Sequence, residues 1–277
     1  MSPLIELDEL LSIADQIILI DARAGADANQ RYLNGHLQGA QFADLDRDLA
    51  IKPENPAYGG RHPLPPVHDF AKQLGKWGIT PDSHVVVYDD KAGAFGGARL
   101  WWMLRAVGHE RVQVLNGGLK AGIDAGVTLS TEPYIAEPVA EYPVPANYNA
   151  TVDINQVDAA AKADDQMVID VREAYRYLGE SEPIDLVAGH IPGAVNMPYV
   201  LNMDTFGKYL EPGELRSTYE KLLGDVDPEN VIVHCGSGVT ACHTLLGMEY
   251  AGITGAKMYV GSWSEWSRRD QPIATGA

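Results

Sequence analysis

The sequence is poor in cysteine and in positive charge, and each shortage excludes a class of protein. Only two of the 277 residues are cysteines, Cys235 and Cys242, too few for a disulfide framework, and no Cys-x-x-Cys pair indicates zinc. Lysine and arginine number 21 against 38 acidic residues, and the net charge of −17 argues against nucleic acid or an anionic membrane as partner. If the substrate is a small anion, the site needs its own arginines.

The chain also lacks long apolar runs and targeting signals. No stretch approaches the length of a membrane span. The first nine residues are acidic and have neither the basic start and apolar core of a secretory signal nor the arginine-rich pattern of a transit peptide. We therefore expect a cytoplasmic protein with reduced thiols.

The second half of the sequence repeats the first at an offset of about 145 to 155 residues. Strands alternate with helices in each half, which predicts an α/β fold of two tandem domains, each with a mainly parallel sheet and helices on both faces. Proline and polar residues at 133–148 predict a linker between domains at 1–132 and 149–277. The repeated segments are 18–23 and 168–172, 85–89 and 231–235, and 114–119 and 259–263.

Cys235 is the strongest functional candidate. It follows the β-branched run 231–233 and precedes two glycines and a helical pattern at 241–251. Unpaired N–H groups and the helix dipole at such a place stabilise a thiolate, which is the reactive form of cysteine. A buried core cysteine is the alternative, as we expect for Cys242. A metal cluster with the neighbouring histidines is disfavoured, because adjacent strand residues point to opposite faces.

The first repeat has Asp89 where the second has Cys235, so only one half carries a nucleophile. Residues that recur in both halves, such as Asp170 and Arg172, are therefore expected to be structural. The full recurring set is Asp21, Arg23 and His36 in the first half, and Asp170, Arg172 and His190 in the second.

Several motifs together resemble the tandem-domain rhodanese sulfurtransferases. They are the repeated Asp-x-Arg, the Gly-His-Ile-Pro-Gly-Ala at 189–194, the strand and loop around Cys235, and the Gly-Ser-Trp-x-Glu-Trp at 261–266. The resemblance covers nearly the whole chain. The loop 235–240 is similar to that of the 3-mercaptopyruvate enzymes, whereas relatives that use thiosulfate usually carry basic residues directly after the cysteine.

The resemblance implies a set of catalytic residues. Cys235 would be the nucleophile, Ser237 would take a proton from the donor thiol, His62 would be the base, and Asp46 would orient it. It also implies that Arg176 binds the donor carboxylate, since a planar guanidinium matches a carboxylate at two points.

A second arginine, frequent in the family after a Glu-Pro pair, is absent here, because Ile184 stands in its place. Carboxylate binding would then depend on Arg176 with help from Arg61 and the loop amides. Phe95 matches an aromatic that lines the pocket. The predicted loop contacts are Gly236, Gly238, Val239 and Thr240.

The implied reaction transfers sulfur in two steps. The thiolate of Cys235 takes sulfur from 3-mercaptopyruvate, pyruvate leaves, and the persulfide passes its outer sulfur to a small thiol, a thioredoxin-like protein or cyanide. The resemblance implies neither a cofactor nor a metal.

Three alternatives remain open. Thiosulfate sulfurtransferase would use the same cysteine with another donor. A cysteine phosphatase would need an arginine six residues after the nucleophile, where this chain has Ala241. A non-enzymatic scaffold would not need Cys235, Ser237 and His62 together.

Overall fold

The computed structural model describes all 277 residues, and they form two compact units that are not contiguous in sequence. The domain bounds 1–132 and 149–277 stay a prediction. In the structure, each compact unit also includes a short segment from the other half of the sequence. Residues 52–63 pack within the second unit, and residues 205–209 pack within the first. The units consist of Met1–Ile51, Leu64–Asn149 and Thr205–Tyr209 in the first, and Lys52–Pro63, Ala150–Asp204 and Leu210–Ala277 in the second.

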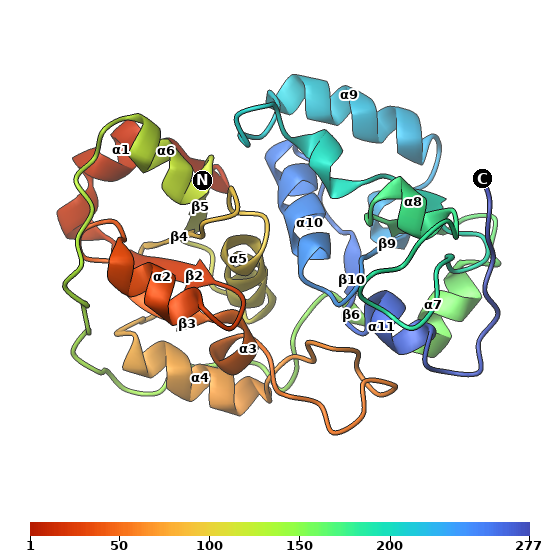
Figure 1. The fold of residues 1–277 in the computed structure, drawn as a ribbon, viewed down its shortest axis with the longest axis horizontal. Coiled ribbons are helices and arrows are strands. Elements are labelled where there is room, and N and C mark those ends of the chain that lie inside the picture. The colour runs from red at the N-terminus through yellow and green to blue at the C-terminus, as the bar shows by residue number, and fades with distance from the viewer. The chain divides into compact units, whose positions relative to one another are not determined.

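The first unit is built on a five-stranded parallel sheet in the order β1-β5-β4-β2-β3 (Figure 1). Side chains of α1 and α6 pack on one face, against Val86 and Leu115, and α5 contacts the three central strands. The strands are β1 (Leu4–Ile5), β2 (Ile18–Arg23), β3 (Gln41–Asp44), β4 (Val85–Tyr88) and β5 (Val112–Leu115). The helices are α1 (Leu7–Ser12), α2 (Ala28–Asn34), α3 (Leu45–Asp48), α4 (Val67–Lys76), α5 (Gly96–Ala106) and α6 (Gly118–Asp124).

The second unit repeats this plan, with a parallel sheet in the order β6-β10-β9-β7-β8. Trp263 and Trp266 of α11 and Val157 of α7 pack against one face, while α10 contacts β9 and α9. The strands are β6 (Thr151–Val152), β7 (Met167–Asp170), β8 (Val195–Asn196), β9 (Val231–His234) and β10 (Lys257–Tyr259). The helices are α7 (Ile154–Ala160), α8 (Ala174–Tyr177), α9 (Pro212–Leu223), α10 (Thr240–Tyr250) and α11 (Ser262–Trp266).

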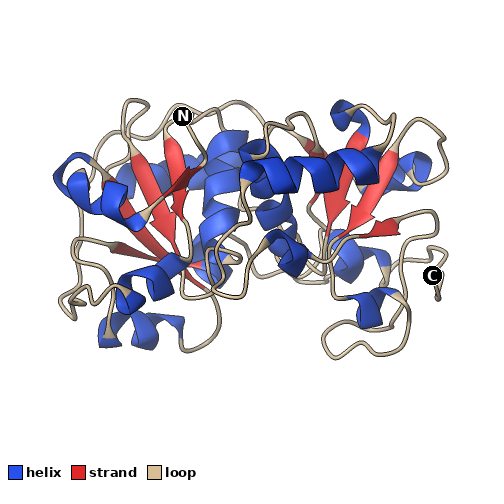
Figure 2. Ribbon diagram, turned by 90° about the horizontal axis from the view of Figure 1, so that it is seen from above, coloured by secondary structure: helices blue, strands red, loops and turns tan.

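Figure 2 shows helices on both faces of each set of strands, and the predicted fold class is confirmed. The sequence pattern succeeds here because strands covered on both faces are continuously apolar, as at 85–88 and 231–233. None of the helices combines the length and the hydropathy needed to span a membrane.

The predicted linker contains no helix or strand, and parts of it run along the first unit. The amide of Val139 donates to the carbonyl of Gly75 (2.9 Å). This backbone hydrogen bond helps to hold in place a proline-rich segment that has no periodicity.

Asp89 takes the place of the nucleophile in the first unit and fills a cradle of amides. Its buried carboxylate accepts four backbone hydrogen bonds of 2.7 to 3.0 Å from the loop that follows β4 and from the start of α5. The donors are the amides of Lys91, Gly93, Phe95 and Gly97. The loop is thus closed around an internal anion, which makes Asp89 a structural residue.

We expect Asp89→Asn to destabilise the protein by about 3 kcal/mol, since the amide turns an NH2 group toward buried donors that need an acceptor. Urea unfolding of this variant, beside the exposed control Asp82→Asn, measures the difference in the free energy of unfolding. Equal stability of the two variants would show that the four hydrogen bonds are dispensable.

Candidate active site

Cys235 lies where the sheet of the second unit ends, between β9 and the loop that leads to α10. Its side chain is buried, and the start of α11 holds its backbone: the amide of Trp263 donates to its carbonyl (3.0 Å), and its own amide donates to Ser262 Oγ (3.2 Å). Burial lowers the pKa of the adjacent His234, so its imidazole is neutral near pH 7 and is not a cation beside the sulfur. The start of α11 thus fixes the backbone of Cys235, from which the thiol projects.

Ser262, which accepts a hydrogen bond from the amide of Cys235, has a strained backbone conformation. It has φ of +52°, an unfavourable value for a residue with a side chain, and it is fully buried. Its hydroxyl also donates to the carbonyl of Tyr259 (2.9 Å). Strain of this kind is concentrated at functional sites, where the surroundings must enforce it.

The predicted loop residues Gly236, Gly238, Val239 and Thr240 link Cys235 to α10. Gly238 has φ of +74°, which glycine adopts without strain. No side chain caps the first turn of α10. The N–H groups at the start of this helix can therefore stabilise negative charge near Cys235.

Ser237 and His62 are hydrogen-bonded, with 2.7 Å between Ser237 Oγ and His62 Nδ1. These residues are 175 positions apart in sequence and come together because the segment 52–63 packs within the second unit. The amide of Arg61 donates to Ser264 Oγ (3.0 Å), and the amide of Gly59 donates to Glu265 (3.1 Å). Helix α11 thus anchors both the segment with His62 and the backbone of Cys235.

Gly60 makes the close approach of this segment possible. Its φ is +80°, and a Cβ at this position would lie 2.3 Å from the carbonyl oxygen of Gly261. A side chain at position 60 would push the segment away from Gly261. The glycine therefore allows Arg61 and His62 to lie close to the start of α11.

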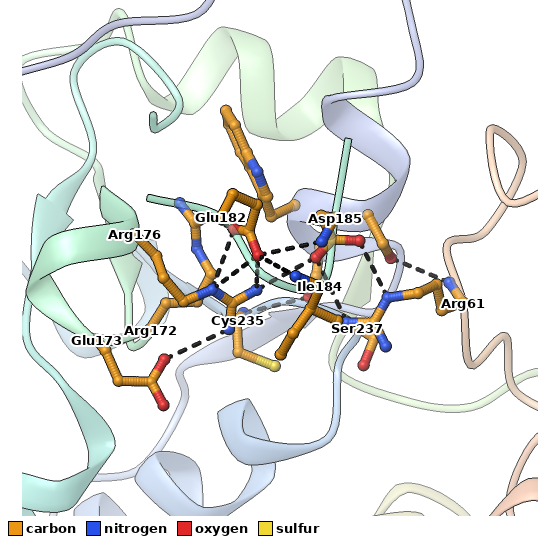
Figure 3. A network of polar contacts seen from close by, with 12 residues as sticks. Arg61, Arg172, Glu173, Arg176, Glu182, Ile184, Asp185, Cys235 and Ser237 are labelled. Carbon is orange, nitrogen blue, oxygen red and sulfur yellow. Dashed lines mark hydrogen bonds and ion pairs between the residues drawn. The ribbon is translucent and has the colours of Figure 1, made fainter. Parts of the chain in front are cut away.

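Arg176 is surrounded by carboxylates (Figure 3). Its guanidinium contacts Glu182 (2.8 Å), Asp185 (3.3 Å) and Glu173 (3.3 Å). Burial would raise the pKa of Glu182, but hydrogen bonds from Arg176 and from the amides of Asp185 and Ile184 outweigh it and hold this pKa below its usual range. Glu182 is therefore ionised at neutral pH and already bonded to the arginine expected to bind the donor.

Asp185 was not among the predicted site residues, yet it joins three guanidinium groups. Its fully buried carboxylate contacts Arg61 (3.0 Å), Arg176 (3.3 Å) and Arg268 (3.0 Å). One feature of the sequence could have drawn attention to Asp185: it directly follows Ile184, which stands where related enzymes have an arginine.

Asp46 and Phe95 belong to the first unit. Asp46 is exposed near the start of α3, and its amide donates to Asp44 Oδ1 (2.9 Å). Phe95 directly precedes α5, and its amide is one of the four donors to Asp89. Their expected roles beside His62 and the donor stay predictions.

The recurring residues form matching buried ion pairs in the two units. Arg23 contacts Asp21 (2.7 Å) and donates to the carbonyl of Gly35, and Arg172 contacts Asp170 (2.5 Å) and donates to the carbonyl of Gly189. Cys242 is fully buried in α10, with its Sγ 3.4 Å from the carbonyl oxygen of Gly238. Both cysteines are free thiols.

Comparison with known proteins identifies the family. A family model described as "Rhodanese-like domain" matches twice, at residues 5–125 and 153–269. The chain belongs to the rhodanese family. This confirms the tandem arrangement that the internal repeat and its motifs predicted.

Relatives named for two different sulfurtransferase activities match most of the chain. "Probable 3-mercaptopyruvate sulfurtransferase" of Pseudomonas aeruginosa is 38% identical over 97% of this chain and 93% of its own length. "Thiosulfate sulfurtransferase" of Bos taurus is 36% identical over 89% and 82%. Among solved structures, "3-mercaptopyruvate sulfurtransferase from Leishmania major" has a TM-score of 0.83 at 29% identity and covers 96% of this chain and 75% of that one. These relatives support the general prediction of a sulfurtransferase.

Proposed function

We propose that this chain is a 3-mercaptopyruvate sulfurtransferase that carries sulfur as a persulfide on Cys235. The hydrogen bond between Ser237 and His62 carries the proposal, since it supplies a proton acceptor next to the nucleophile. A thiol donor has a proton to lose, whereas thiosulfate has none. The loop 236–240 has no cationic side chain, which also favours a donor other than a dianion.

In the first step, the Cys235 thiolate attacks the donor sulfur. An S–S bond forms, the C–S bond breaks, and its electron pair leaves on the carbon fragment as the enolate of pyruvate. Ser237 accepts the thiol proton and passes its own to His62, while the loop amides stabilise charge at the sulfur. The enolate then takes up a proton to become pyruvate.

In the second step, a nucleophilic acceptor attacks the outer sulfur of the persulfide. The S–S bond breaks, and its electron pair returns to Cys235 as a thiolate. A small thiol, a thioredoxin-like dithiol or cyanide has the required nucleophile. Transfer through one covalent intermediate gives ping-pong kinetics.

Thiosulfate sulfurtransferase is the second candidate, and one observation favours it. A Cβ at Gly236 would lie 3.1 Å from Nη2 of Arg61 and 3.4 Å from Nη2 of Arg176, so two cations flank the residue after the nucleophile. Such cations suit a dianionic donor.

The two candidates are separated by initial rates with each donor and cyanide as acceptor. We expect kcat/KM for 3-mercaptopyruvate to exceed that for thiosulfate, with one pyruvate released for each thiocyanate formed. A higher kcat/KM with thiosulfate would reject the proposal and leave the Ser237–His62 contact without a role in the reaction.

A further inference from the structure

The first turn of α11 holds two chain segments that the proposed reaction needs side by side. It holds the loop of the nucleophile through the backbone contacts of Cys235 and through the amide of Ser264, which donates to the carbonyl of Gly236 (2.8 Å). It also holds the segment 52–63, which carries His62. The position of the base relative to the sulfur therefore depends on one helical turn.

Two side chains of this turn accept hydrogen bonds from the backbone directly before His62. The Oγ of the fully buried Ser264 accepts from the amide of Arg61 (3.0 Å). Glu265 Oε1 accepts from the amide of Gly59 (3.1 Å). A backbone amide that is buried without an acceptor is costly, so these two bonds restrict where the segment can lie.

The first unit provides an internal comparison, because it has the same fold without a nucleophile. The amide of Leu119 in α6 donates to the carbonyl of Asp89 (2.8 Å). The amide of Trp263 in α11 donates in the same way to the carbonyl of Cys235 (3.0 Å). This shared hydrogen bond aligns the two helices residue by residue and belongs to the common fold.

The next two positions differ between the aligned helices. The first unit has Lys120 and Ala121 where the second has Ser264 and Glu265. Neither a lysine ammonium nor an alanine methyl can accept a hydrogen bond from a backbone amide, and Lys120 instead pairs with Asp124 at the surface. The two acceptors thus occur only in the half of the chain that has the nucleophile, which points to a role in the reaction.

We propose that Ser264 and Glu265 are positioning residues for proton transfer, which hold His62 at hydrogen-bond distance from Ser237. The inference rests on the proposed function, because it requires His62 to act as the base. A misplacement of about 1 Å in a catalytic group can cost about 10²-fold in rate. Two hydrogen bonds next to the base are therefore expected to affect the donor step strongly.

Glu265→Ala and Ser264→Ala test this role in the full-length protein, with the two half-reactions measured separately. We expect pyruvate release in a single turnover with 3-mercaptopyruvate to slow about 10- to 100-fold, because His62 is no longer held beside the donor proton. Thiocyanate release from persulfide-loaded protein and cyanide should be unchanged, since that step removes no proton from a donor. Glu220→Ala, which removes an exposed carboxylate from α9 of the same unit, is the matched control.

Two further variants separate positioning from folding. Glu265→Gln keeps a side-chain oxygen for the amide of Gly59 and should recover most of the lost rate. In a His62→Gln background, Glu265→Ala should cause no further loss, because both changes act through one imidazole. Ser264→Ala decides the test by itself if Glu265→Ala does not fold.

Equal losses in the two half-reactions would make α11 a support of the Cys235 loop only and would overturn the proposal. Losses that multiply in the His62→Gln background would do the same, since Glu265 would then act independently of the base. Unchanged pyruvate release from a folded protein with both alanine substitutions is the third contradicting result. Wild-type protein that releases no pyruvate would instead reject the proposed function and this inference with it.

Discussion

Cys235→Ser is expected to abolish sulfur transfer from either donor, with a loss of at least about 10⁴-fold in kcat, because the nucleophile acts in both steps of a ping-pong reaction. The hydroxyl of serine is a poor nucleophile toward sulfur and does not form a persulfide. Two measurements check this: pyruvate and thiocyanate release at steady state, and the mass of the intact protein after incubation with donor alone. Wild-type protein should gain the mass of one sulfur atom, and the variant should gain none.

Cys242→Ser is the matched control for this experiment. Cys242 is fully buried in the first turn of α10 and lies outside the loop that holds the reactive sulfur. We expect this variant to keep its activity and to gain one sulfur atom like the wild type. Sulfur gained by the Cys235→Ser protein would assign the carrier to another residue and contradict the mechanism.

The architecture could be predicted from the sequence because it depends on periodicity and repetition. The β-branched runs at 85–87 and 231–233 are buried on both sides, and the matched pairs Asp21–Arg23 and Asp170–Arg172 fall at equivalent strand ends. The exchange of residues 52–63 and 205–209 was not predictable. These segments have no periodicity, and their place depends on long-range contacts such as that of Gly60 with Gly261.

The site could be predicted only in part, for a related reason. Cys235 is marked by local features, a strand end followed by glycines, and the partnership of Ser237 with His62 follows from family motifs. The environment of Arg176 is different, because it depends on how the turn at 182–185 folds. There Glu182 accepts from the amides of Ile184 and Asp185 and faces the guanidinium. A motif identifies an arginine but not the carboxylates that neutralise it.

His62→Gln is expected to separate the two donors. The glutamine side chain keeps a polar group near Ser237 but cannot accept a proton to form a cation, so kcat with 3-mercaptopyruvate should fall roughly 10²-fold, a typical contribution of a general base. Sulfur transfer from thiosulfate requires no proton transfer from the donor and should be nearly unchanged. Steady-state rates with both donors measure the ratio directly.

The control is His68→Gln on α4, which replaces an exposed histidine six positions along the chain and should change neither rate. Ser237→Ala should reproduce the donor-selective loss, because it removes the hydroxyl that links His62 to the donor proton. If His62→Gln slowed both donors equally, the contact would serve to shape the loop around Cys235, since a change in the nucleophile's surroundings affects every donor. A loss confined to the thiol donor would instead assign the pair to proton transfer, because that step alone distinguishes the two reactions.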